Sequence, residues 1–285
     1  MVREVLSMLR CLIAFLFLSA FVLGQEKVLQ VEQVKGRAWL VVNGKRQKLE
    51  VGKLSFGAKI ECERGAKAKV VMPDGSYAVL LPPSHGCVTT SVTFDKTSEG
   101  KDAAFLDEGA LKALFATKRF CVVAGRMFLI EPLPPKHPEG KFLAEVIVRL
   151  VKKKKESWWS VFAVTNNVKV LLSDSGAEIT IPENEVALLR FLEEKKEWQI
   201  KADEANEKNV VLRGRDGAKK ELTPNEVAEV YADKKDTAKY GLVVPPPPPP
   251  EARLRRERLL QLPKDRPYED AGEVQEAPYV TPKKP

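Results

Sequence analysis

The stretch QVEQVKGRAWLVVNGKRQKLEV, residues 30–51, decides the fold class. Over residues 30–42 apolar and polar side chains alternate, with one break at Gly36, and this is the period of a strand that buries one face. Asn43-Gly44 follows, which is the strongest short signal for a tight hairpin turn. The stretch therefore predicts a β-hairpin.

The same pattern of strand and turn continues beyond this hairpin. The alternation runs on to Leu49 and Val51, which are expected on one face, and Asp74-Gly75 marks a further turn. Strands of roughly five to seven residues, separated by turns every 8–12 residues, are typical of a sandwich or barrel. Helical periodicity is scarce: residues 102–115 fit one short helix, but residues 106–115 fit a pair of strands too. We therefore expect a mainly β protein with an antiparallel β-sandwich.

The second half of the chain contains an internal repeat with a spacing of 41 residues. Asn184-Glu185-Val186-Ala187 recurs as Asn225-Glu226-Val227-Ala228, and Val170-Leu171 is matched with Val211-Leu212. The unit consists of a strand, a glycine turn, a strand, a corner with a proline and another strand. We expect this repeated hairpin unit to build a stacked β-sandwich, with the repeated glutamates on a solvated strand edge.

The composition divides the chain into five segments. These are a signal peptide at residues 1–24, a first β-region at 25–130, a Pro-rich linker at 131–141, a second β-region with the repeat at 142–244 and a Pro-rich tail at 245–285. The tail begins with six consecutive prolines, which favour polyproline II and cannot join a sheet as an inner strand. We expect the tail to be disordered. The sequence leaves open whether the two β-regions form one domain or two.

The N-terminal segment has the features of a secretory signal. Arg3 and Arg10 precede an apolar run at residues 11–23, and small residues lead to a cut after Gly24. The run is about 13 residues long, whereas a helix that spans a bilayer needs about 20. We expect a periplasmic or secreted protein that begins at Gln25, with an uncleaved membrane anchor as the alternative.

The net charge of the chain favours an anionic partner. The net charge is +8 at pH 7, with both signs interspersed along the chain. We expect the partner to be an envelope protein or an anionic cell-wall or membrane polymer, and the exported compartment argues against nucleic acid. The candidate partner-binding residues are Lys152, Lys153, Lys154 and Lys155 in one loop, and Arg253, Arg255, Arg256 and Arg258 in the tail.

Three cysteines remain after the expected signal cleavage. The odd count of Cys62, Cys87 and Cys121 suggests one disulfide and one spare thiol. A disulfide between Cys62 and Cys87 is one candidate, Cys121 is the other candidate partner, and the pairing stays open. His85 beside Cys87 could contribute to a zinc-like site, but no paired C-x-x-C spacing supports it. We therefore predict no metal, no cofactor and no catalytic residue.

A set of short motifs resembles the FecR domain family over about residues 28–130. The motifs are Val34-x-Gly36, Asn43-Gly44, Leu49-x-Val51-Gly52, Leu54, Gly57-x-x-Ile60, Ala66-x-Ala68-x-Val70, Asp74-Gly75-Ser76, Leu81-x-Pro83 and Leu106-Asp107-Glu108-Gly109-Ala110-Leu111. The resemblance implies a periplasmic β-sandwich of jelly-roll type without catalytic residues. Members that transduce signals add a cytoplasmic region that binds a sigma factor. Only ten residues precede the apolar run here, so we do not extend that activity to this chain.

These observations predict an exported, non-enzymatic FecR-like binding or scaffolding module of the cell envelope. The alternatives are a carbohydrate-binding or hydrolytic envelope protein that uses a sandwich face near Trp158 or Trp159, and a membrane-anchored envelope sensor with an uncleaved N-terminal helix. Neighbouring residues of a strand point to opposite faces, so we expect only one of the two tryptophans to face solvent.

Overall fold

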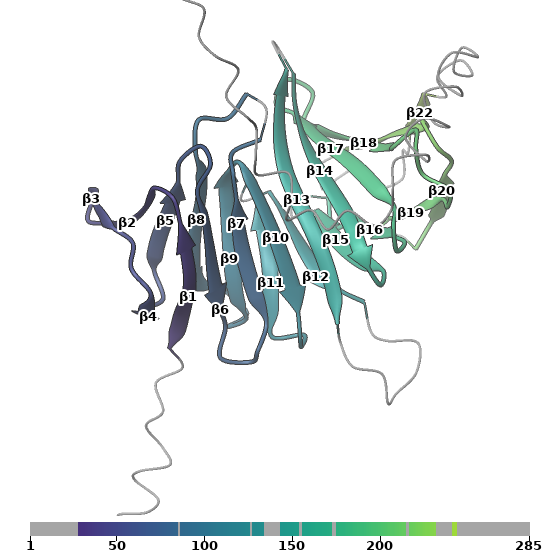
Figure 1. The fold of residues 1–285 in the computed structure, drawn as a ribbon. Helices are drawn as coiled ribbons and strands as arrows, with labels where there is room; N and C mark the ends of the chain where they lie inside the picture. Colours follow the sequence, from purple (N-terminus) through teal and green to yellow (C-terminus); the bar gives the residue numbers. More distant parts are fainter. Residues whose placement is uncertain are drawn as a thin grey trace, which may run out of the picture.

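The structure is a computed structural model that describes residues 28–84, 86–125, 127–133, 143–153, 156–172, 175–214, 217–231 and 241–243. Its regular elements are strands, arranged in two sheets of eleven strands each (Figure 1). The predicted signal segment and the Pro-rich tail lie outside these residues. No helix among the described residues is long and apolar enough to cross a membrane.

Sheet A runs in the spatial order β22 (Gly241–Val243), β21 (Val227–Tyr231), β18 (Glu197–Ala202), β17 (Val186–Leu192), β14 (Glu156–Thr165), β13 (Ala144–Lys153), β10 (Ala110–Phe115), β7 (Tyr77–Leu81), β6 (Lys67–Val71), β1 (Leu29–Lys35) and β4 (Gly52–Leu54). Sheet B runs in the order β20 (Lys219–Leu222), β19 (Val210–Arg213), β16 (Glu178–Ile181), β15 (Val168–Leu172), β12 (Phe128–Pro132), β11 (Phe120–Ala124), β9 (Asp102–Glu108), β8 (Thr90–Lys96), β5 (Ala58–Cys62), β2 (Ala38–Val42) and β3 (Lys45–Lys48).

The strand pairing confirms the predicted antiparallel β-sandwich. Neighbouring strands are antiparallel except for β9 and β11, which are parallel. Residues 102–115, for which a helix was an open alternative, form β9 in sheet B and β10 in sheet A. The chain passes directly between the two sheets at Gly109, which separates these two strands.

From β11 onward the chain alternates hairpins between the sheets. Hairpins β11–β12, β15–β16 and β19–β20 lie in sheet B, and hairpins β13–β14, β17–β18 and β21–β22 lie in sheet A. One copy of the internal repeat therefore corresponds to one hairpin in sheet B followed by one hairpin in sheet A. Asn184 and Asn225 hold the same corner in a left-handed conformation, with φ of 66° and 70°.

The sequence alignment of the repeat is wrong by one residue in its first strand. Val168 pairs with Ile181, and Val210 pairs with Leu222. This register makes Val170 equivalent to Leu212, which are both fully buried, whereas the alignment equated Val170 with Val211. The turn of the first copy is one residue longer, and the 41-residue spacing holds only after that turn.

The first ten strands are less regular. In this part of the chain, sheet A contains the single strands β1, β4 and β10 and the hairpin β6–β7. The strands between them in sequence belong to sheet B. The prediction of Leu49 and Val51 on one strand face is wrong. Strand β3 ends at Lys48, where Leu49 turns inward to donate its N–H to the carbonyl of Ala38, so that Leu49 is buried and Val51 is 62% exposed.

Both predicted β-regions contribute to both sheets. Strand β13 pairs with β10 across sheet A, and β12 pairs with β15 across sheet B. Glu131 and Pro132, which the sequence suggested as the start of a linker, belong to β12 and pair with Lys169 and Val168. One apolar cluster extends between the sheets from Leu29 to Val230. The sandwich therefore has a continuous core along its whole length.

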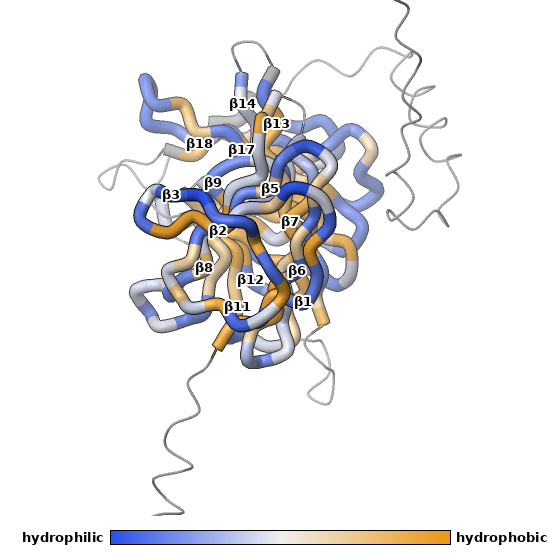
Figure 2. Tube along the Cα trace, turned by 60° about the vertical axis from the view of Figure 1, so that its left-hand side comes forward, coloured by the Kyte–Doolittle hydropathy of each residue, from blue (hydrophilic) through white to orange (hydrophobic). Residues whose placement is uncertain are grey.

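Both sheets end in short strands. The edges of sheet A, β4 and β22, have three residues each, and the edges of sheet B, β3 and β20, have four each. Strand β3 reads Lys-Arg-Gln-Lys, is exposed throughout and is drawn blue at the near end of the molecule in Figure 2. Short edges that carry lysines discourage pairing with the sheet of another molecule.

Candidate functional site

The three described cysteines are free thiols. Cys62 points into the core from β5 and Cys121 is fully buried on β11, and burial raises the pKa of each thiol to about 12. Cys87 is half-buried and its thiol donates to the carbonyl of Leu150 at 3.4 Å. The candidate disulfide between Cys62 and Cys87 is therefore not formed in the structure, and neither is a bond from Cys121.

The described part of the chain contains no group of three His, Cys, Asp or Glu side chains that could hold a metal ion. His85, which the sequence placed beside Cys87 as a candidate ligand, lies outside the described residues.

The predicted basic loop is described only at its start. Lys152 forms an ion pair with Glu108, with Nζ and Oε1 2.6 Å apart, and this hydrogen bond raises the pKa of Lys152. The side chain of Lys153 and all of Lys154 and Lys155 lie outside the described residues. The tail residues Arg253, Arg255, Arg256 and Arg258 lie outside them as well.

The two neighbouring tryptophans point in opposite directions, as the alternation of the strand predicted. Trp159 lies in the core, where its ring meets that of Phe128 edge to face at a centroid distance of 5.9 Å. Trp158 is half-buried on the outer face of sheet A. The guanidinium carbon of Arg190 lies 4.6 Å from the centroid of the Trp158 ring, so Arg190 occupies one face of that ring.

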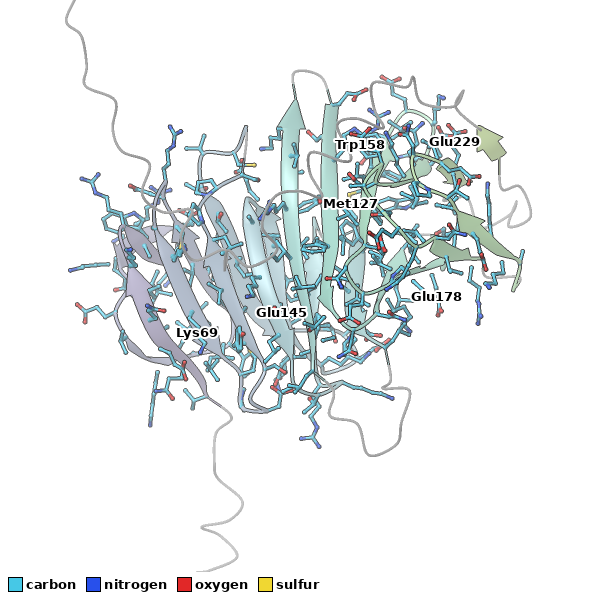
Figure 3. The ribbon with its side chains drawn as sticks, turned by 45° about the vertical axis from the view of Figure 1, so that its right-hand side comes forward. Lys69, Met127, Glu145, Trp158, Glu178 and Glu229 are labelled. Carbon is cyan, nitrogen blue, oxygen red and sulfur yellow. The ribbon has the colours of Figure 1, made fainter. Side chains whose placement is uncertain are left out.

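Arg190 belongs to a polar row that crosses the outer face of sheet A. Its guanidinium pairs with Glu156 at 2.8 Å and donates to the side-chain oxygen of Gln199 at 2.6 Å. Gln199 in turn donates to Glu229 at 3.0 Å. Figure 3 labels Trp158 and Glu229 in this region. The hydrogen bond from Arg190 holds the pKa of Glu156 below its usual range.

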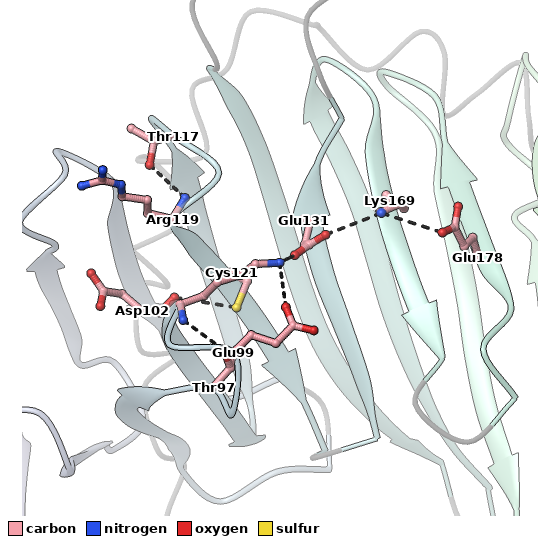
Figure 4. A network of polar contacts seen from close by, with 10 residues as sticks. Thr97, Glu99, Asp102, Thr117, Arg119, Cys121, Glu131, Lys169 and Glu178 are labelled. Atoms are coloured by element: carbon pink, nitrogen blue, oxygen red, sulfur yellow. Dashed lines mark hydrogen bonds and ion pairs between the residues drawn. The ribbon is translucent and has the colours of Figure 1, made fainter.

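A second charged row crosses the outer face of sheet B (Figure 4). Lys101 pairs with Glu99 at 3.3 Å and with Glu131, and Lys169 pairs with Glu131 at 3.6 Å and with Glu178 at 3.9 Å. The hydrogen bond to Glu131 raises the pKa of Lys101 and outweighs burial, which lowers it. Charges of alternating sign therefore neutralise one another along this face.

The repeated glutamates are not equivalent, and the expectation of a solvated edge is wrong for Glu185. Glu185 is 2% exposed, and its two carboxylate oxygens accept the backbone N–H groups of Glu207 and Lys208 at 2.9 Å each. Glu226 instead accepts the N–H and the hydroxyl of Thr223 and pairs with Lys220 at 3.0 Å. Both carboxylates therefore stabilise corners of the fold.

The positive charge of the protein is concentrated at the N-terminal end of the sandwich. Residues 28–72 contain ten Lys and Arg against four Glu, a net charge of +6, whereas the whole chain has a net charge of +8. Residues 175–209, which lie in β16, β17, β18 and their connections, contain five Lys and Arg against nine Asp and Glu, a net charge of −4. Sequence reasoning averaged these regions and missed the asymmetry, which a count of charge along the chain reveals.

Most of the cations at this end have no acidic partner. Glu61 pairs with Arg46 at 2.6 Å and with Lys59 at 3.4 Å. Glu32 pairs with Lys69 at 2.7 Å, and Glu63 pairs with Arg37 at 4.0 Å. Six others have no carboxylate of the described residues within 4.0 Å. They are Lys35, Lys45, Lys48, Lys53, Arg64 and Lys67. This end of the sandwich is therefore the candidate interaction surface.

The chain matches no protein-family model, no curated protein and no solved structure. The resemblance to the FecR domain stays a prediction from the sequence.

Proposed function

We propose that this chain is an exported, non-enzymatic binding or scaffolding module of the cell envelope, of FecR-like type. Its partner is an envelope protein or an anionic cell-wall or membrane polymer. Its location is the periplasm or the extracellular space.

The observation that carries this proposal is the continuous apolar core between two long sheets. The core runs from Leu29 to Val230 and makes the sandwich one elongated body with two broad outer faces. Such a body suits a scaffold, because it holds surface groups that are far apart at fixed positions.

The shifted pKa values support a binding role over a catalytic one. In enzymes such shifts gather in one cleft. Here the shifted acidic and basic groups Lys101, Lys152, Glu156, Glu221 and Glu226 belong to five separate contacts, and their shifts follow from local hydrogen bonds. These contacts join strands or hold a corner of the fold. The raised pKa values of Cys62 and Cys121 follow from burial in the core.

Sedimentation with isolated cell envelopes tests the proposal. The full chain should co-sediment with envelopes and stay in solution with cytosolic material, and mass spectrometry of the exported protein should find Gln25 at its N-terminus. Intact Met1 on membrane-bound protein would favour the anchored sensor. A protein that stays in solution with every envelope fraction would contradict the binding module.

Carbohydrate binding at Trp158 is the second candidate, favoured by the outward ring of Trp158 beside Arg190, Gln199 and Glu229. Planar polar side chains beside an indole suit a sugar, but Arg190 occupies one face of the ring. Binding of soluble glycans that is lost in Trp158→Ala and kept in Trp39→Ala would support this candidate. Equal binding by both variants would exclude the site.

A further inference from the structure

The N-terminal end of the sandwich terminates in an edge strand that is charged along its length. Strand β3 contributes Lys45, Arg46 and Lys48, and β4 adds the exposed Lys53. Figure 1 shows β2 and β3 at one end of the molecule and β19 and β20 at the opposite end. The end of the sandwich is therefore a narrow basic edge.

Two exposed valines bracket this edge strand. Val42 is 45% exposed and pairs with Lys45 at the start of β3, and Val51 is 62% exposed just after its end. Asn43 and Gly44 both have positive φ, 50° and 76°, which is the geometry of a type I′ turn and fixes the hairpin tightly. We name the segment at residues 42–53 the basic edge.

The exposed lysines of the basic edge differ from those of the opposite end. Lys195 and Lys196 pair with Glu197 and Glu193, at 3.4 and 3.0 Å. Lys45, Lys48 and Lys53 have no such partner among the described residues. The sandwich therefore has a positive part, at residues 28–72 with a net charge of +6, and a negative part, at residues 175–209 with a net charge of −4. A negatively charged surface would therefore attract the basic edge and turn the acidic region away.

We propose that the basic edge docks this protein onto the surface of a bilayer that contains anionic lipid. The proposal rests on the proposed function as an envelope-binding module and names its surface and partner. Lysines near such a membrane are attracted by its negative surface potential. Val42 and Val51 enter the boundary between headgroups and acyl chains, where apolar side chains leave water.

The exposed valines favour a bilayer over a soluble anionic polymer. A polymer attracts the lysines equally well, but it offers no apolar region for Val42 and Val51.

Vesicle sedimentation with the full chain tests the proposal. The protein should bind vesicles of phosphatidylcholine mixed with phosphatidylglycerol and not vesicles of phosphatidylcholine alone, and added salt should release it because salt screens the attraction. The triple variant Lys45→Gln, Lys48→Gln, Lys53→Gln should lower the partition coefficient by at least about tenfold. The matched control Lys195→Gln, Lys196→Gln, Lys219→Gln removes the same charge and should leave it within about twofold.

A double variant, Val42→Ser with Val51→Ser, separates the bilayer from the polymer. It should weaken binding to mixed vesicles and leave binding to a heparin column unchanged. Equal loss in both triple variants would overturn the proposal, because net charge alone would then explain binding. If the double valine variant binds mixed vesicles as tightly as the wild type, the bilayer proposal is overturned in favour of a polymer. Circular dichroism checks that each variant is folded.

The outcome also separates this proposal from the proposed function. Protein that sediments with isolated envelopes but not with mixed vesicles contradicts the docking surface and leaves the envelope module in place. Protein that binds neither contradicts both. Protein that forms larger assemblies without vesicles, and loses them in the triple variant of the basic edge, assigns that edge to contacts between copies and overturns the docking proposal.

Discussion

Residues 28–72 and residues 175–209 lie in different parts of the same two sheets and differ in connectivity and charge. The first region visits each sheet by single strands and short excursions, has a net charge of +6 and leaves several lysines without partners. The second repeats one hairpin pattern and has a net charge of −4, and its carboxylates hold a corner, as Glu185 does, or pair across strands, as Glu178 does with Lys169. The comparison shows that the regularly repeated hairpins and the lysines without acidic partners lie in different parts of one sandwich.

The largest loss of stability is expected at Gly109, where the chain passes from β9 in sheet B to β10 in sheet A. Gly109 has a φ of +90°, and a Cβ there would lie 2.5 Å from the Cα of Thr90. Gly109→Ala should lower the free energy of unfolding by more than about 3 kcal/mol, because backbone strain adds to overpacking. Gly100 also has positive φ but has open space around it, so Gly100→Ala should cost about 1 kcal/mol.

Urea unfolding measures both glycine variants. Two separate transitions in Gly109→Ala would show that the two regions do not share a cooperative core. Equal losses in the two variants would show that the approach to Thr90 is not close.

A smaller effect should separate the repeated glutamates. Glu185→Ala leaves two buried N–H groups without an acceptor and should lower the free energy of unfolding by about 2–3 kcal/mol. Glu226→Ala should cost less, about 1–2 kcal/mol, because Thr223 can turn to water while the buried ammonium of Lys220 loses its carboxylate partner. Thermal or urea denaturation of both variants provides the comparison. Equal losses in the two variants would contradict the prediction, because they would show that the two glutamates contribute equally to the free energy of unfolding.

The turn between β6 and β7, among the less regular first ten strands, should show a loss of stability of more than about 1 kcal/mol. Gly75 has a φ of +85°, and its closest neighbour for an added Cβ is Ala116 at 4.0 Å, so the cost of Gly75→Val comes from the backbone. Gly75→Asn is the matched control, because asparagine tolerates this conformation, as Asn43 and Asn184 do here. The prediction fails if the melting temperature of Gly75→Val equals that of the wild type.

The smallest expected effect is a dependence of stability on pH at Glu226, in the second copy of the repeated corner. Burial tends to raise the pKa of Glu226, but the hydrogen bonds from Thr223 and Lys220 outweigh it and lower that pKa below its usual 4.5. A carboxyl whose pKa is lower in the folded state adds stability above its unfolded pKa and loses it as pH falls through its folded pKa. The stability difference between wild type and Glu226→Gln should therefore shrink as pH falls below about 4.5. A difference that is constant with pH would contradict the assignment.

Much of the fold could be predicted from local sequence. Alternation and turn residues indicated the β class, the Asn43-Gly44 hairpin and the repeated corner, because these depend on residues close in the chain. The order of strands could not be predicted, since the parallel pair of β9 and β11 joins segments that alternation alone cannot match.

The misses at individual residues have a similar cause. Glu185 resembles a surface residue in sequence, and its burial depends on a loop about twenty residues further along, which folds over it. Val51 fitted a strand face until the chain turned inward at Leu49. The basic edge was missed for another reason, because charge averaged over the chain conceals a local excess.

Hydrogen exchange with and without mixed anionic vesicles tests the central contrast most directly. Amide groups of residues 42–53 should exchange more slowly when vesicles are present, because β3 is an exposed edge strand that the bilayer would cover. Amide groups of residues 175–209 should exchange at an unchanged rate. Slower exchange over residues 175–209, or unchanged exchange at residues 42–53 in protein that has bound the vesicles, would contradict the division between an interacting end and a scaffold.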